Sequence, residues 1–369
     1  MSDADTAPFH GVLTRFSYQN VPGGDGNRSI PPWQLTEDLL SPRRLDFRLA
    51  VFEMTCAASL LGQTQQDFEW ILIIDRRLPE RYRIKIERLL VGRRRTHLYE
   101  YQPGEDLGNV GWLRRYIVQG CSHLLTTQLD DDDALPRNFI EVLQRRVRRQ
   151  AASLPIQVAA STRSDQWELL SSARAPLGYR CAWHRGDWIT SAGLSLLSPV
   201  SPDCLTVLSL NHLLADIWTS PARGAGLQRL LLEKWGEAAR RPETTRFIAA
   251  RLDEFQQRVR RLSGASSLPE DGGFIDLTAE VGAVVVGNHF LNDQYLRLLE
   301  RKSGRSRAQG PESFPNVTLR FDRFRERSCL FRKCWSNYWR LLRISCTRSG
   351  RWRQRARMLI WASWRFLRA

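Results

Sequence analysis

The sequence predicts an α/β protein: a doubly wound, mostly parallel sheet with helices on both faces, followed by a C-terminal helical basic extension. Three observations predict it. Over residues 1–160, short apolar runs alternate with stretches of helical spacing, as in parallel βαβ units. The run 68–75 is apolar almost throughout, which is typical of a strand covered on both faces. Residues 323–369 hold 14 Lys and Arg and one acidic residue.

The elements of the first half follow in chain order from these patterns. Strands are expected at residues 11–16, 68–75, 96–101, 124–129 and 156–160. Helices are expected at 45–61, after Pro79, at about 109–122 and at 136–149. In the first of these helices, Leu45, Leu49, Phe52 and Cys56 recur at helical spacing. A loop rich in Gly and Pro, at about 21–43, separates the first strand from this helix.

The second half of the chain is less regular. Short extended pieces are expected in 161–215, a charged helical stretch in 226–262, and strands at 274–277, 283–286 and 317–321. We therefore expect three parts: a sheet domain at 1–215, a mixed helical and strand extension at 216–322, and a basic tail at 323–369. A chain of 369 residues is long enough for one large or two ordinary domains.

Four consecutive carboxylates, Asp130 to Asp133, come directly after the apolar run 124–129, and Asp75 ends the run 68–75. In an open parallel sheet both places lie at the carboxyl edge, where ligands bind. Like charges this close repel, so they need a cation or hydrogen-bond donors. A divalent cation with a substrate diphosphate would suit these oxygen ligands. The alternative is a solvated acidic turn that caps the helix after Pro136.

Several classes of protein are excluded or disfavoured by what the sequence lacks. It has no G-x-x-x-x-G-K-[ST] segment, and no G-x-G-x-x-G follows the first strand, which disfavours P-loop enzymes and dinucleotide dehydrogenases. Its seven cysteines include no C-x-x-C pair, so neither a zinc site nor a disulfide framework is indicated. There is no apolar run of about 18 residues, and the first residues lack the pattern of a signal peptide. We expect a cytoplasmic protein.

The basic tail at 323–369 carries five of the 13 tryptophans on stripes of helical spacing, with arginines between them. Basic amphipathic helices with Trp at the boundary suit an anionic membrane surface. Nucleic-acid binding is the rival interpretation, and a helix pair packed on the body is another. We favour the membrane because the aromatic residues follow a helical stripe. This places the protein at the inner face of the plasma membrane as a peripheral protein.

Several segments together resemble a known family. The most specific is Thr126-Thr127-Gln128-Leu129 with the four aspartates and Ala134-Leu135. The supporting segments are Thr14-Arg15-Phe16-Ser17, Phe52-Glu53, Ser59-Leu60, Gln63-Thr64 and the run 68–75. Over about residues 10–215 the chain resembles the putative rhamnosyltransferase family, bacterial glycosyltransferases with a GT-A-type nucleotide-sugar fold. The resemblance implies that residues 1–215 form a catalytic domain that binds a nucleotide-sugar.

The resemblance also implies roles for individual residues. Asp130 and Asp132 match the D-x-D pair that holds a divalent cation, Mg²⁺ or Mn²⁺, and the diphosphate. Asp133 would contact the cation or the sugar, and Asp75, Thr14 and Arg15 would hold the nucleotide. The sequence departs from the family pattern at two positions, with Gln128 in place of Arg and Asp131 in place of Asn.

Two further roles are less defined. The segment 193–197 followed by His212 resembles the family's later segment, which makes His212 the candidate third metal ligand. A histidine with its hydrogen bonds satisfied near a helix start is the alternative. Transfer with inversion needs a base for the acceptor hydroxyl. Asp165, Glu168 and Asp187 lie in a suitable region, nothing in the sequence selects one, and a retaining mechanism stays open.

The leading hypothesis is a metal-dependent glycosyltransferase. Its acceptor would be a hydroxyl of a cell-surface polysaccharide or lipid-linked glycan, and the family label implies rhamnose from a dTDP donor. One alternative is a non-catalytic protein with a sugar-nucleotide fold, anchored to membrane or nucleic acid by its basic tail. Another is a methyltransferase unit in residues 267–322, which lacks the expected glycine-rich loop.

Overall fold

A computed structural model of the chain describes residues 8–17, 39–102, 105–150, 156–161, 163–170, 178–185, 189–202, 204–210, 273–287 and 306–307, and single positions at 215, 253, 257, 260 and 261. The expected strand at 317–321, the basic tail and most of the charged stretch 226–262 lie outside these residues. Within the described residues, no helix is both long and apolar enough to cross a membrane.

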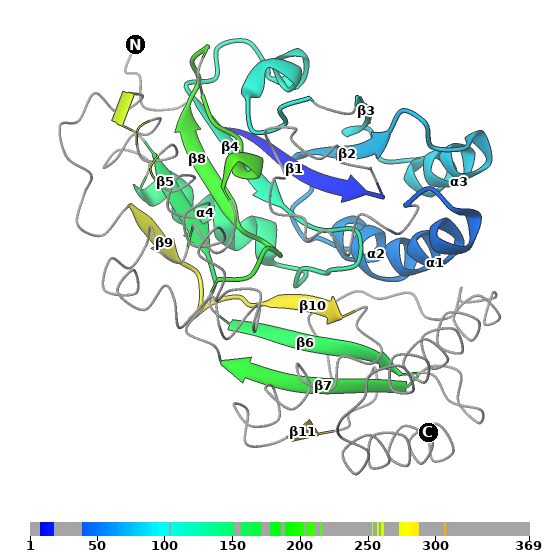
Figure 1. The fold of residues 1–369 in the computed structure, drawn as a ribbon. Coiled ribbons are helices and arrows are strands. Elements are labelled where there is room, and N and C mark those ends of the chain that lie inside the picture. Colours follow the sequence, from blue (N-terminus) through cyan, green and yellow to red (C-terminus); the bar gives the residue numbers. More distant parts are fainter. Residues whose placement is uncertain are drawn as a thin grey trace, which may run out of the picture.

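The centre of the fold is a seven-stranded sheet with the order β3-β2-β1-β4-β8-β5-β9 (Figure 1). Its strands are β1 (Phe9–Phe16), β2 (Glu69–Asp75), β3 (Thr96–Tyr101), β4 (His123–Gln128), β5 (Gln157–Ala160), β8 (Ser195–Pro199) and β9 (Phe274–Asp276). Strand β8 runs antiparallel to both of its neighbours, and the other pairs are parallel. The predicted fold class, a mostly parallel α/β sheet, is confirmed.

Helical segments cover both faces of this sheet. On one face lie α1 (Pro42–Phe52), a π-helical turn η1 (Glu53–Ala57), α2 (Ala58–Leu61), α3 (Glu80–Leu90) and α4 (Phe139–Gln150). Their apolar side chains pack with those of alternate strand positions such as Val12, Leu72 and Leu125. The other face is covered by short 3₁₀ helices, η2 (Val110–Trp112), η3 (Arg114–Tyr116) and η4 (Val207–Ser209).

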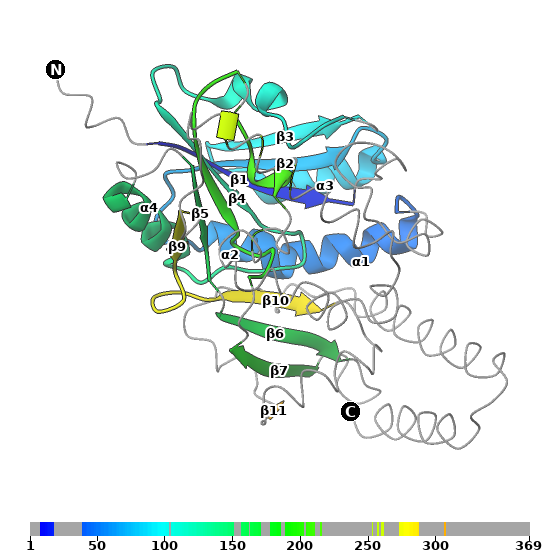
Figure 2. The same cartoon turned by 60° about the vertical axis from the view of Figure 1, so that its left-hand side comes forward.

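A second, four-stranded sheet has the order β10-β6-β7-β11. Its strands are β6 (Arg163–Leu170), β7 (Gly178–Arg185), β10 (Ala283–Gly287) and β11 (Ser306–Arg307). Both views place α1 and α2 between the two sheets (Figures 1 and 2). Strand β6 follows β5 along the chain and β10 follows β9, and the pairs β5–β9 and β6–β10 are both parallel. Residues 274–287, which lie in the range expected as an extension, therefore add strands to both sheets.

Among the described residues, the predicted helices and strands are present except in one place. The predicted helix at 109–122 is wrong: the chain forms the two short 3₁₀ helices η2 and η3 there. Asn109 caps the first one by accepting a hydrogen bond from the backbone of Gly111, and Trp112 donates its indole N–H to the carbonyl of Leu107 at 3.0 Å. Gly120, with φ of 88°, ends the segment in a conformation that interrupts a helix.

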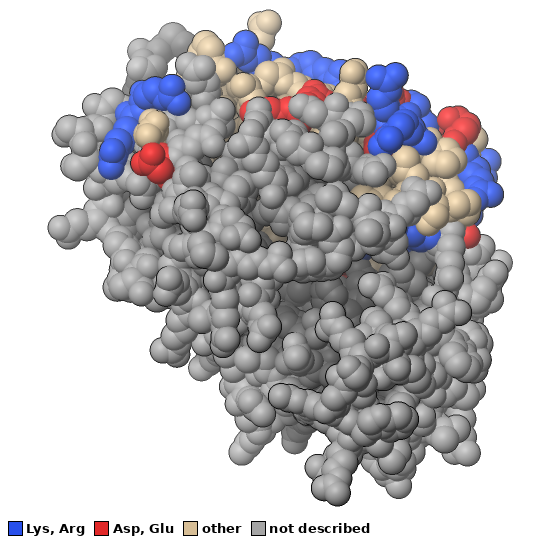
Figure 3. Space-filling view, viewed as in Figure 1, with Lys and Arg blue, Asp and Glu red and all other residues tan. Residues whose placement is uncertain are grey.

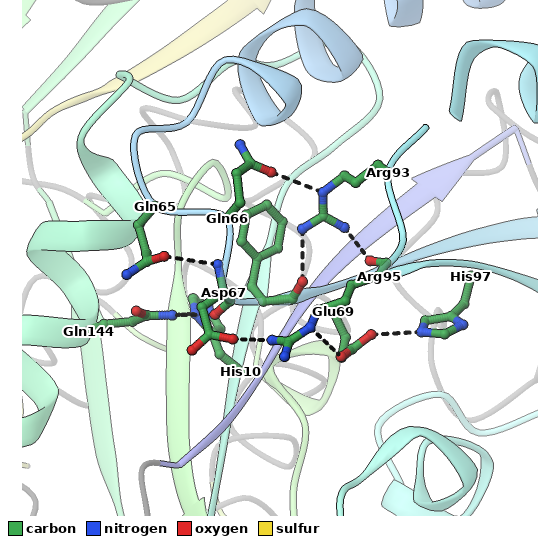
Figure 4. A network of polar contacts seen from close by, with 10 residues as sticks. His10, Gln65, Gln66, Asp67, Glu69, Arg93, Arg95, His97 and Gln144 are labelled. Carbon is green, nitrogen blue, oxygen red and sulfur yellow. Dashed lines mark hydrogen bonds and ion pairs between the residues drawn. The ribbon is translucent and has the colours of Figure 1, made fainter. Parts of the chain in front are cut away.

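A network of polar contacts lies at the amino-terminal ends of β2 and β3 (Figure 4). Arg93 donates to the carbonyl of Phe68 at 2.8 Å and lies over its ring, 4.0 Å from the centroid. Arg95 pairs with Asp67, and His97 contacts Glu69 at 2.8 Å between their side chains. These contacts fix the starts of β2 and β3.

Candidate functional site

The acidic turn, residues 130–133, lies at the carboxyl edge of the sheet, immediately beyond β4. Its entry is fixed by a hydrogen bond from the backbone N–H of Leu129 to the carbonyl of Leu13 in β1, at 3.1 Å. The turn closes on itself, since the N–H of Asp133 donates to the carbonyl of Asp130 at 3.1 Å. The predicted placement of the aspartates at a strand end is therefore confirmed.

The four carboxylates do not face the same way. Asp131 and Asp133 are buried, with 1% and 4% of their surface exposed. The side chains of Asp130 and Asp132 are 25% and 17% exposed. The two partly exposed carboxylates are therefore the alternate pair, which is the spacing of the D-x-D motif.

Asp130 is held from one side of the sheet by Arg15 of β1. The Nη2 and Nε atoms of Arg15 donate to Asp130 Oδ1 at 2.8 and 3.3 Å, and the amide of Gln128 donates to the same oxygen at 3.2 Å. Burial on its own would raise the pKa of Asp130. The charge and hydrogen bonds of Arg15, together with Gln128 and the charge of Arg48, outweigh it and hold that pKa below its ordinary value. Asp130 is therefore ionised near neutral pH.

Arg48 of α1 holds the next two aspartates from the face of the sheet that α1 covers. Its Nε donates to Asp131 Oδ2 at 3.0 Å, and its Nη2 pairs with the other oxygen of that carboxylate. Its Nη1 donates to Asp132 Oδ2 at 2.9 Å. One guanidinium thus bridges a buried and a partly exposed carboxylate. Its positive charge reduces the repulsion between carboxylates that the sequence predicts for this turn.

Asp75 ends β2 at the same edge of the sheet and is fully buried. Its Oδ1 accepts hydrogen bonds from the backbone N–H and the Nε of Arg77, both at 2.9 Å, and its Oδ2 accepts one from Arg77 Nη2 at 2.8 Å. Strand β1 lies between β2 and β4, so Asp75 stands two strand spacings, roughly 10 Å, from the acidic turn.

Thr14 of β1 points into the core, away from the exposed part of the turn. It is fully buried, and its hydroxyl accepts a hydrogen bond from the indole of Trp70 at 3.0 Å and lies 3.8 Å from the thiol of Cys56. Burial raises the pKa of Cys56, the hydrogen bond with Thr14 lowers it, and the charge of Asp133 raises it, with a net increase. The thiol stays protonated, and in these contacts Thr14 ties β1 to β2 and η1.

Ser17 follows β1 directly and carries local strain. Its φ of 43° lies in the left-handed region, which is uncommon for a residue with a side chain. Its hydroxyl oxygen is buried and has no hydrogen-bond partner among the described residues. Strain and an orphan polar atom at the carboxyl end of β1, two residues after Arg15, mark Ser17 as a candidate ligand contact. Nothing in the sequence predicts this conformation. A glycine or an asparagine at position 17 would have indicated it, because these residues adopt positive φ more readily.

The remaining predicted site residues are placed only in part. His212 and Asp187 lie outside the described residues. Asp165 and Glu168 belong to β6 of the second sheet, where their backbones pair with Trp183 and Arg180 of β7. Within the described part of the chain, no three His, Cys, Asp or Glu side chains form a group that could hold a metal ion.

Sequence reasoning missed three residues of this site: Arg48, Arg77 and Ser17. Arg77 stands two positions after Asp75, so an Asp-x-Arg turn at a strand end was the signal that could have found it. Arg48 gave no such signal, because an arginine on a helix is most often solvated.

One protein family matches part of this chain. Residues 10–163 match the model of a family described as "Putative rhamnosyl transferase". The resemblance seen in the motifs is confirmed for this segment. The segment is less than half of the chain, and it contains the acidic turn, Arg15, Arg48 and Asp75. The match supports a glycosyltransferase.

Solved structures that resemble this one include the crystal structure of S. aureus TarS. It is 10% identical, the likeness covers 45% of this chain and 21% of that chain, and the TM-score is 0.23. The chain thus spans about a fifth of the TarS chain. No curated protein matches the sequence.

Proposed function

We propose that this protein is a glycosyltransferase that moves a sugar from a nucleotide-diphosphate donor to an acceptor hydroxyl. The observation that carries the proposal is the acidic turn at the carboxyl edge, where Asp130 and Asp132 are the reachable carboxylates. An open α/β sheet binds its ligand at this edge. The family match of residues 10–163 supports the same activity.

A divalent cation, Mg²⁺ or Mn²⁺, is part of this proposal. Asp130 and Asp132 fit such an ion, because partly exposed carboxylate oxygens on one turn are the ligands that hard cations prefer. An ion held there would neutralise the charge of the departing diphosphate. His212 remains the proposed third protein ligand.

The chain's own residues have distinct tasks in this mechanism. Arg15 keeps Asp130 ionised and oriented, and Arg48 does the same for Asp131 and Asp132. We assign Asp75, held by Arg77, to the ribose or base of the nucleotide, since it lies at the same edge two strands away. Asp133 is assigned to the sugar or the cation.

The proton of the acceptor hydroxyl must go to a base. Asp165, Glu168 and Asp187 remain the candidates, with Asp165 and Glu168 on strand β6 of the second sheet. The donor we propose is dTDP-rhamnose, on the family description, and the acceptor is a cell-surface polysaccharide or lipid-linked glycan. The basic tail at 323–369 would bring the enzyme to the inner face of the plasma membrane, where such acceptors are built.

The test is the thermal stability of the protein with nucleotide-sugars and Mn²⁺, together with release of nucleoside diphosphate. A ligand that binds the native state raises the melting temperature by mass action. We expect a shift that needs both the cation and one nucleotide-sugar. Removal of an outer-shell partner of a metal ligand already weakens metal binding by about tenfold or more. Asp132→Asn changes a proposed ligand itself, so it should weaken this joint binding by more than about tenfold.

Asp67→Asn is the matched control, because Asp67 also pairs with an arginine but lies at the opposite edge of the sheet. It should leave the shift unchanged. A protein that shows no shift and releases no diphosphate with any nucleotide-sugar would contradict the proposal.

The non-catalytic alternative has one observation in its favour: the protein's own arginines already pair with Asp130, Asp131 and Asp132. Binding without release of nucleoside diphosphate, in the presence of a polysaccharide or lipid-linked acceptor fraction, would favour it over the enzyme.

A further inference from the structure

The contacts of Arg48 divide into two unequal halves. Its Nε and Nη2 atoms engage both oxygens of Asp131, which is 1% exposed, whereas only Nη1 reaches Asp132. A bidentate pair between a guanidinium and a buried carboxylate is strong and geometrically specific. The contact with the partly exposed Asp132 is single, so Arg48 can give it up while it stays anchored on Asp131.

The carboxylate that Arg48 touches with Nη1 is also one that the proposed cation needs. A guanidinium and a divalent cation both require the lone pairs of carboxylate oxygens, and two positive groups on one carboxylate repel each other. Arg15 and Arg48 both pair with carboxylates of the turn, so an ion bound there would compete with a guanidinium that is already present.

We propose that Arg48 is the built-in counter-ion of the acidic turn: it competes with a divalent cation for Asp132 and, once released from that carboxylate, binds the diphosphate of the donor. The inference rests on the proposed function and adds to the proposed site a residue from the face of the sheet that α1 covers. Arg48 stays held by Asp131, so its Nη1 remains beside the turn, where an anionic diphosphate would lie.

The proposal predicts two effects of opposite sign. Loss of the Arg48 charge should tighten Mn²⁺ binding in the absence of nucleotide, because a competitor is gone. The same loss should weaken nucleoside diphosphate binding at saturating Mn²⁺, because a donor to the phosphate is gone. We expect each change to be about tenfold, within the range for a hydrogen bond to a charged group. A residue that only supports the fold would weaken both.

The experiment measures Mn²⁺ affinity by electron paramagnetic resonance on the full chain, first alone and then with dTDP, UDP or GDP. The variant is Arg48→Gln. Because it leaves the buried Asp131 charge without its main partner, Arg48→Gln combined with Asp131→Asn serves as a second variant whose fold does not need that charge pair. Arg83→Gln is the control, since Arg83 pairs with Glu87 and Glu100 on α3 and β3. Urea denaturation checks that each protein is folded.

Tighter Mn²⁺ and weaker nucleoside diphosphate binding in both Arg48 variants, with neither in Arg83→Gln, is the expected result. Unchanged or weaker Mn²⁺ binding in the folded double variant would overturn the inference, as would absence of Mn²⁺ binding in the unaltered protein. Release of nucleoside diphosphate from the donor separates the two proposals. If the donor still releases nucleoside diphosphate but the Arg48 substitutions leave Mn²⁺ affinity unchanged, the inference about Arg48 is wrong and the proposed glycosyltransferase activity is kept. If the Arg48 substitutions change Mn²⁺ affinity but no nucleotide-sugar releases nucleoside diphosphate, the proposed glycosyltransferase activity is wrong.

Discussion

At the scale of single residues, His10 of β1 is a buried titratable group, 4% exposed. The amide N–H of Gln144 donates to His10 Nδ1 at 3.1 Å, so the ring's proton is on Nε2 and is directed to the hydroxyl of Thr127 at 2.9 Å. Thr127 in turn contacts Ser195 at 2.8 Å, and Ser195 donates to the carbonyl of Gly193 at 3.0 Å. This chain of bonds accepts only a neutral imidazole.

The pH dependence of stability follows from this environment. Burial lowers the pKa of His10 from 6.5 to about 3. Below pH 6.5 the unfolded chain therefore binds a proton that the native protein does not, and the free energy of unfolding falls by up to about 1.4 kcal/mol per pH unit until about pH 3. The depressed pKa of Asp130 acts in the same direction at lower pH.

The substitution His10→Gln should remove this contribution, because the amide can hydrogen-bond without titrating. We expect the difference in stability between the variant and the unaltered protein to shift in favour of the variant by about 1–2 kcal/mol between about pH 7 and about pH 5. Urea denaturation across that range measures it. Two parallel stability curves would show that His10 is not buried in its neutral form.

At the scale of elements, the entry to β8 supports the acidic turn through Gly193. The backbone N–H of Gly193 donates to the carbonyl of Gln128 at 2.9 Å, and the N–H of Gln128 donates to the carbonyl of Leu194 at 2.8 Å. Gly193 has φ of 79°, and a Cβ there would lie 2.7 Å from Cζ of Phe139 in α4. No side chain fits between β8 and α4 at this point.

Gly193→Ala should therefore destabilise the protein by about 2–4 kcal/mol, the sum of overpacking and an unfavourable φ. Gly92→Ala is the matched control, because Gly92 has φ of 98° but nothing within 4 Å of the added Cβ, so it should lose only the conformational part. Urea denaturation gives both values. Equal losses at the two positions would show that Phe139 does not confine Gly193.

The elements also show what sequence can predict. Strand β2 was predictable because burial on both faces leaves an apolar run that little else produces. The acidic turn was predictable because its carboxylates adjoin a strand end in the sequence. The segment 110–116 was not, because Val110 and Leu113 fit helical spacing, while the cap of Asn109 and long-range packing select 3₁₀ turns. Arg48 lies 83 residues from Asp131, and only the folded sheet brings them together.

At the scale of the whole molecule, positive charge is distributed unevenly. Residues 1–322 carry 41 basic and 38 acidic side chains. On α3, exposed Arg81, Lys85 and Arg88 stand beside Glu80 and Glu87, and Figure 3 shows both signs on the described surface. The surplus is in the basic tail, with 14 Lys and Arg against Glu326. A body with balanced charge and a strongly basic segment suggests that the tail, rather than the sheet domain, attracts an anionic surface.

The tail prediction concerns four arginines that alternate with other residues in 351–357. In the full chain, replacement of Arg351, Arg353, Arg355 and Arg357 by Gln should weaken binding to vesicles that contain phosphatidylserine by at least about tenfold, since each basic residue near such a surface contributes about 1 kcal/mol. Sedimentation with vesicles measures it, and added salt should reduce binding of the unaltered protein. Vesicles of phosphatidylcholine alone are the control. The variant should keep its response to nucleotide-sugar and Mn²⁺, because those residues lie outside the matched segment 10–163. Equal vesicle binding by both proteins, with loss of binding to a single-stranded RNA in the variant, would assign the tail to nucleic acid instead.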